Sequence, residues 1–105
     1  MGDRGNVKII DSFDPDRHVH LYTHWRGSEL KDIVKCALAK RWRWDDSAYL
    51  ARIVFCEMIK GAEGDETGFG ISQEACDEGP LVVLDPANQK ITIGKRTWTF
   101  EEFVA

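Results

Sequence analysis

The chain has 105 residues, of which 43% are hydrophobic and 30% charged, and this fits one globular domain over residues 1–105. No apolar run approaches the roughly 20 residues of a membrane-spanning helix, and the first residues lack the apolar core of a signal peptide. We therefore expect a protein that binds no membrane. Three cysteines without a CxxC pair argue against a disulfide framework, and we expect Cys36 and Cys56 to be buried, reduced thiols, which indicates a cytoplasmic protein.

The net charge of −4 is spread unevenly along the chain. Residues 1–44 carry nine basic and six acidic side chains (+3), whereas residues 57–78 carry seven acidic side chains and one lysine (−6). An acidic segment disfavours direct nucleic-acid binding through its own face, because that binding depends on neutralising phosphates. It suits a basic protein surface instead, since complementary potentials steer two proteins together.

Two strands that form a hairpin are predicted at the start of the chain. Residues 6–11 read N-V-K-I-I-D, and residues 18–23 alternate as H-V-H-L-Y-T, which is typical of a half-buried strand. The D-P-D sequence between them favours a turn. In the second strand His18, His20 and Tyr22 share one face.

Two helices are predicted next. Ser28 is the expected N-cap of the first, whose apolar residues recur at helical spacing as far as residue 38. Asp45 or Asp46 is expected to cap the second helix, and Gly61 to end it. The expected apolar face of the second helix comprises Tyr49, Leu50, Ile53, Val54, Met58 and Ile59.

Three further strands are predicted, through residues 69–73, 80–84 and 90–93. Thr99 and Glu102 have the spacing of a capping box for a short C-terminal helix. The order is β-β-α-α-β-β-β plus that helix, and separate runs of strands and helices indicate an α+β fold. We expect an antiparallel sheet of about five strands with the two helices packed on one of its faces.

The histidines are the first candidates for chemistry. His18 and His20 could converge on zinc, but a catalytic zinc needs three protein ligands, and His24 lies at or beyond the strand end. We expect a solvated or helix-covered face there, with no metal and no cofactor. Gly68-Phe69-Gly70 lacks the spacing of a phosphate-binding loop, and no catalytic motif is found, so we expect no enzymatic activity.

A polar and aromatic cluster lies between the second strand and the first helix: Tyr22, His24, Trp25 and Arg26. Ligands often bind at such a place, because a helix N-terminus favours anions. A small-ligand-binding protein or an enzyme that uses this cluster is the alternative function. The structural interpretation is that His24 and Trp25 pack the corner and that Arg26 pairs with a carboxylate.

The segment Arg41-Trp42-Arg43-Trp44 has the basic and aromatic mixture that binds single-stranded nucleic acid. It is short and the chain is acidic, so we expect one or both tryptophans to anchor the corner between the helices. No direct contact with nucleic acid is predicted.

The acidic stretch is the most distinctive feature of the chain, and it is either a solvated loop or a contact surface for a basic protein. Exposed carboxylates alone contribute little affinity, so a contact surface needs an apolar anchor, for which Phe69 is the candidate. The predicted protein-binding residues are Glu63, Asp65, Glu66, Phe69, Glu74, Asp77 and Glu78.

Several strings in the chain resemble a family of small proteins of bacteria and their phages that has no established catalytic residues: L-Y-T-H-W, R-W-D-D, Y-L-A-R-I and E-T-G-F-G-I-S. The resemblance implies a context, because small acidic phage proteins often inhibit host defence, and some anti-CRISPR proteins occupy a basic nucleic-acid path. The expectation is a non-enzymatic, phage- or prophage-encoded inhibitor of a bacterial defence complex such as a CRISPR–Cas effector. Its acidic surface would cover a basic nucleic-acid-binding site.

Overall fold

Alternating side chains build the hairpin at the start of the chain. In the computed structural model, which describes residues 3–74 and 79–105, strand β1 (Gly5–Ile10) pairs antiparallel with β2 (His18–Thr23), and Val7 lies opposite Leu21. Both of these side chains are buried on one face of the sheet. The predicted hairpin and its inward face are thus confirmed.

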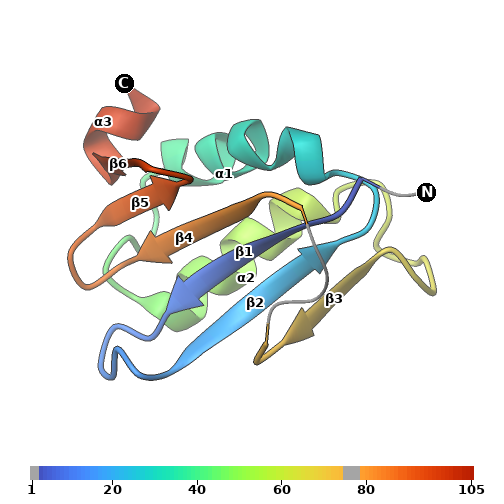
Figure 1. The fold of residues 1–105 in the computed structure, drawn as a ribbon, viewed down its shortest axis with the longest axis horizontal. Helices are drawn as coiled ribbons and strands as arrows, with labels where there is room; N and C mark the ends of the chain where they lie inside the picture. Colours follow the sequence, from blue (N-terminus) through green and yellow to red (C-terminus); the bar gives the residue numbers. More distant parts are fainter. Residues whose placement is uncertain (1–2, 75–78) are drawn as a thin grey trace.

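The remaining elements follow in the predicted order, with one additional strand (Figure 1). They are η1 (Gly27–Glu29), α1 (Leu30–Ala39), α2 (Ser47–Met58), β3 (Phe69–Ser72), β4 (Leu81–Asp85), β5 (Lys90–Ile93), β6 (Arg96–Thr99) and α3 (Phe100–Val104). The α+β class is confirmed. None of the helices within the described ranges is long and apolar enough to cross a bilayer.

The sheet is mixed and has six strands in the order β3-β2-β1-β4-β5-β6. The expectation of a wholly antiparallel sheet with one strand fewer is wrong. Strand β4 lies beside β1 and parallel to it, with Val82 opposite Val7, because the chain returns from the outer strand β3 past β2 and β1 before it pairs again. Strand β6 was missed because its four residues, R-T-W-T, have one large apolar side chain.

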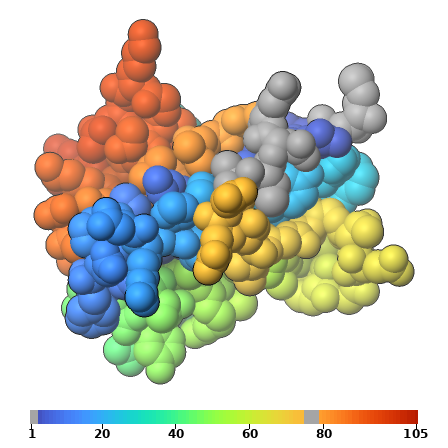
Figure 2. All heavy atoms as spheres, turned by 60° about the horizontal axis from the view of Figure 1, so that its bottom comes forward, coloured from blue at the N-terminus to red at the C-terminus, as the bar shows by residue number. Residues whose placement is uncertain are grey.

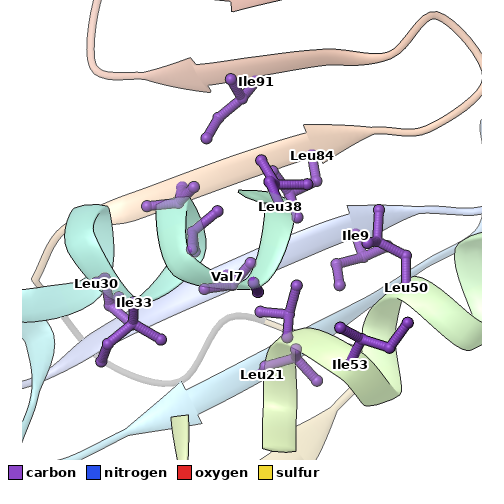
Figure 3. Close-up of a cluster of buried hydrophobic side chains, with 14 of the residues drawn as sticks. Val7, Ile9, Leu21, Leu30, Ile33, Leu38, Leu50, Ile53, Leu84 and Ile91 are labelled. Carbon is purple, nitrogen blue, oxygen red and sulfur yellow. The ribbon is translucent and has the colours of Figure 1, made fainter. Parts of the chain in front are cut away.

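One core lies between the sheet and the helices. Figure 1 shows α1 and α2 on the same side of the sheet, and Figure 3 shows their apolar side chains meeting those of the central strands. The helical spacing of Leu30, Val34 and Leu38 turns one stripe of α1 to the sheet. The fully buried side chains at this contact include Val7, Leu21, Leu30, Val34, Leu38, Leu50, Val54, Leu84 and Ile91.

Local signals set most of the helix ends. The Asp46 carboxylate accepts hydrogen bonds from the first backbone N–H groups of α2, and Thr99 with Glu102 forms the predicted capping box of α3. Gly61 adopts the positive φ of 86° that suits glycine after a helix. Ser28 is not the expected N-cap, since it lies within η1 and its hydroxyl donates to the Asp3 carboxylate.

The cysteine prediction is wrong, because Cys36 and Cys56 are both exposed. In α1 the buried stripe passes through Ile33 and Ala37 and leaves Cys36 on the outer surface. In α2 the buried residues likewise occupy one side of the helix and include Ile53 and Val54, whereas Cys56 lies on the opposite, outer side. Apolar neighbours in sequence therefore did not indicate burial.

The core can be tested by the same truncation at two phenylalanines. Phe100 is 0% exposed and its ring lies against Trp44, whereas Phe13 is 94% exposed. Phe100→Ala is expected to lower the free energy of unfolding by about 3–5 kcal/mol, because it leaves a cavity. Phe13→Ala is expected to change it by less than about 0.5 kcal/mol. Urea unfolding measures both, and equal effects would contradict the assigned core.

Candidate functional site

The acidic loop, residues 61–68, follows α2 and carries three of the predicted binding residues. Glu63, Asp65 and Glu66 are all exposed there, and none forms an ion pair within the described ranges. Two backbone hydrogen bonds turn the chain at the start of the loop: the Ala62 N–H donates to the Ile59 carbonyl, and the Asp65 N–H donates to the Ala62 carbonyl. Figure 2 shows the loop (yellow) projecting from one end of the molecule. Its negative charge is thus displayed outward, and no basic side chain in the described part of the chain neutralises it.

The acidic loop runs directly into β3, which is an outer strand of the sheet. Phe69, the predicted anchor, is half-buried at the start of this strand. Ile71 is 61% exposed, although its register opposite Leu21 places it on the same face of the sheet as the core. Strand β3 lies beyond β2 at the edge of the sheet (Figure 1), and the Ile71 side chain on its inner face remains in solvent. Sequence reasoning missed Ile71, because only the strand order reveals it.

The other predicted binding residues do not join this surface. Glu74 is exposed and lies beyond the far end of β3. It lines a hollow of about 790 Å³ with residues that include Arg17 and Ser47. The four residues of β3 span roughly 13 Å, so Glu74 is well separated from Glu66. Residues Asp77 and Glu78 lie outside the described part of the chain.

The residues of the alternative cluster, at the corner between β2 and η1, lie close together. Their polar groups mainly make hydrogen bonds that stabilise this corner. The Tyr22 hydroxyl lies 3.0 Å from Nδ1 of His24, and the ring of His24 lies against that of Trp25 with 4.3 Å between centroids. The Arg26 guanidinium donates to the backbone carbonyl of Met58 at 3.1 Å, at the C-terminal end of α2. Arg26 was expected to pair with a carboxylate, and it instead provides a hydrogen-bond donor for a backbone carbonyl at the end of this helix.

Thr23, the last residue of β2, stabilises the backbone of this corner. Its buried hydroxyl oxygen accepts hydrogen bonds from the backbone N–H groups of Trp25 and Arg26. The indole of Trp25 lies so close to Gly68 that an added Cβ there would collide with it. Glycine at position 68, with a φ of 104°, therefore lets the acidic loop pass over Trp25 and enter β3.

The face of the sheet away from α1 and α2 carries the predicted histidine pair. His18 and His20 share this face as expected, with 4.9 Å between their ring centroids. A solvated or helix-covered face was expected here. His20 is instead 5% exposed on the face away from α1 and α2, and the backbone of Gln73 hydrogen-bonds to it. Burial lowers the pKa of His20 below its ordinary value, and the nearby His18 and Lys8 act in the same direction. Its Nδ1 atom is buried without a partner in the described structure.

No metal centre can be assembled from the described residues, since no group of three or more histidine, cysteine or carboxylate side chains is suitably placed.

The two tryptophans between the helices differ in their burial and contacts. Trp44 packs against Phe100 and donates from its indole nitrogen to the Leu38 carbonyl, so it anchors the corner as expected. Trp42 is 58% exposed.

No protein-family model, curated protein or solved structure matches this chain. The resemblance to a family of small bacterial and phage proteins therefore stays a hypothesis.

The lowered pKa of His20 predicts how stability depends on pH. Below about pH 6.5, the ordinary pKa of histidine, the unfolded chain takes up a proton that the folded chain resists. The free energy of unfolding should therefore fall as the pH drops through this region, by at most about 1.4 kcal/mol per pH unit for one proton. His20→Gln should remove this part of the pH dependence. Urea unfolding at pH 8 and pH 5.5 measures it, and an unchanged pH dependence in the variant would contradict the assignment.

Proposed function

We propose that this protein is a non-enzymatic binding protein that docks on a basic protein surface through the acidic loop and β3. One observation carries the proposal: three exposed carboxylates without an ion-pair partner in the described structure adjoin an outer strand that displays the apolar side chain of Ile71. Charge supplies attraction, and the apolar side chain supplies a desolvated contact.

The two parts of this surface act at different ranges. The carboxylates of Glu63, Asp65 and Glu66 attract a positive surface at a distance, which raises the rate of encounter and selects against acidic partners. At contact, the outer edge of β3 can offer backbone N–H and C=O groups to a strand of the partner. Ile71 then removes apolar surface from water, which exposed charges cannot do. The combination supports a specific complex rather than a loose electrostatic association.

We further propose that the partner is a component of a bacterial defence complex, such as a CRISPR–Cas effector, and that binding covers its nucleic-acid path. A protein that holds nucleic acid needs a row of lysine and arginine side chains for the phosphates. The acidic loop is complementary to such a row. The resemblance to small phage and bacterial proteins supports the choice of partner, and the proposed action is stoichiometric and needs no catalytic group.

Charge reversal in the acidic loop tests the electrostatic part. Asp65→Lys combined with Glu66→Lys should weaken inhibition of target-DNA binding by a susceptible purified effector at least tenfold, because attraction becomes repulsion. Fluorescence anisotropy of labelled target DNA measures this loss. Asp16→Lys combined with Asp45→Lys changes the net charge equally at two other exposed sites and should leave inhibition nearly intact.

Equal loss in both double variants would show that only net charge matters and would contradict the assigned surface. A wild-type protein that leaves DNA binding unchanged in every effector of a broad panel would contradict the choice of partner.

Truncation of Ile71 tests the apolar part. Ile71→Ala should weaken the same complex about tenfold, or roughly 1.4 kcal/mol, as expected for an anchor side chain. High salt screens exposed charges and spares apolar contacts. The loss in this variant should therefore persist in high salt, while the effect of charge reversal shrinks. Leu81→Ala removes a comparable exposed side chain from β4 and serves as the control; if it weakens the complex equally, β3 is not the contact.

A further inference from the structure

The connection between α1 and α2 contains two arginines in left-handed backbone. Arg41 has a φ of 59° and Arg43 a φ of 54°, and the described residues include just one other non-glycine residue with positive φ, Gln89. This conformation is unfavourable for a side chain that has a Cβ. Strained backbone is found disproportionately at functional sites, where the surrounding structure holds it in place. Two such residues on either side of Trp42 therefore suggest a function for this corner.

The first half of the connection is fixed to the rest of the protein. The Arg41 guanidinium donates two hydrogen bonds to the Glu101 carboxylate of α3, at 2.8 and 2.5 Å. It also lies 5.2 Å from the centre of the Trp44 ring, which packs on Phe100 in the core. These contacts join the start of the connection to α3 and, through Trp44, to the core.

The second half of the connection is displayed to solvent. Trp42 and Tyr49 are both exposed, and each ring has a cation over it: Nζ of Lys40 lies 5.3 Å from the Trp42 centroid, and the Arg43 guanidinium lies 4.7 Å from the Tyr49 centroid. Trp42, Arg43 and Tyr49 border a shallow hollow of about 510 Å³. It is lined by Arg41, Trp42, Arg43, Tyr49, Arg52 and Ile53.

No carboxylate from residues 3–74 or 79–105 lines this hollow. Among the described residues, Arg43 and Arg52 form no ion pair, so their positive charge is available to a ligand. The hollow also lies toward the start of α2, whereas the acidic loop follows its end. Figure 2 shows the green atoms around the start of α2 and the yellow loop at opposite ends of this view. The rise of α2 from Arg52, the lining arginine closest to the loop in sequence, to Met58 is roughly 9 Å, which is about the Debye length at 0.1 M salt, and the acidic loop begins beyond that at residue 61.

The hollow combines two kinds of recognition. Arginine side chains bind phosphate oxygens through their planar fork of N–H donors, and exposed tryptophan and tyrosine rings stack on nucleobases. A phosphate alone would leave Trp42 without a role, and an apolar ligand would leave the arginines without one. We propose that this hollow binds a nucleotide unit, with its phosphate at Arg43 and Arg52 and its base on Trp42.

A free nucleotide and a single-stranded nucleic acid both supply this chemistry. The expectation of no direct contact with nucleic acid rested on the shortness of the basic segment and on the acidity of the chain. In the structure Tyr49 and Arg52 join that segment around the hollow, and the acidic loop is a different surface. The proposed site is independent of the proposed partner, because Asp65→Lys combined with Glu66→Lys leaves the hollow unaltered. That double variant should retain nucleotide binding even where it loses inhibition.

The test uses a fluorescein-labelled oligothymidylate of about 15 nucleotides, with unlabelled ADP and pyrophosphate as competitors. The wild-type protein should bind the oligonucleotide, with an affinity that falls as salt rises. Trp42→Ala and Arg52→Ala should each weaken binding at least tenfold. Arg96→Ala is the matched control, since Arg96 also lies over a tryptophan, 5.0 Å from the Trp98 centroid, away from the hollow.

Arg43→Gly separates binding from folding. Glycine accepts the φ of 54° without strain, so this variant should lose nucleotide binding while its melting temperature does not fall. Competition by ADP at concentrations similar to those of the oligonucleotide would identify a free nucleotide as the source, whereas failure of ADP to compete would identify a single strand. Pyrophosphate that competes as well as ADP would overturn the role of Trp42. Absence of oligonucleotide and ADP binding, or equal losses in the Arg52 and Arg96 variants, would overturn the site.

Discussion

The whole arrangement depends on the burial of one apolar face of the sheet against α1 and α2. Val7, Leu21 and Leu84 supply that face and meet Leu38 and Leu50 from the helices (Figure 3). Because both helices must lie on this side and run in opposite directions (Figure 1), their connecting loop falls at one end of α2 and the acidic loop at the other. Hydrophobic packing thus determines where the charges are displayed.

This separation allows one small protein to present two surfaces of opposite charge. The acidic loop continues into the outer strand β3, where Ile71 adds an apolar contact. At the other end of α2, strained backbone at Arg43 holds an exposed basic and aromatic hollow. Such strain lowers stability, and burial of the core offsets it.

Periodicity and capping chemistry predicted every strand except β6, the three α-helices and their order, because these features depend on neighbours in sequence. Non-local features were not predictable in the same way. The pairing of β1 with β4 joins segments more than 70 residues apart, as Val7 and Val82 show. The site was predicted in part: the charge of the acidic loop is plain in the sequence, whereas the exposure of Ile71 depends on the strand order. The left-handed backbone of Arg43 has no sequence signal, since glycine and asparagine are the usual residues for it.

We infer that the two charged surfaces of this protein are separate and independently accessible. The most direct test is amide chemical-shift mapping of the labelled protein during titration with an oligolysine peptide. We expect shifts confined to residues 62–72, the acidic loop and β3, with the amides of residues 40–53 unchanged. Shifts spread evenly over other acidic sites, such as Asp16 and Glu102, would contradict this separation.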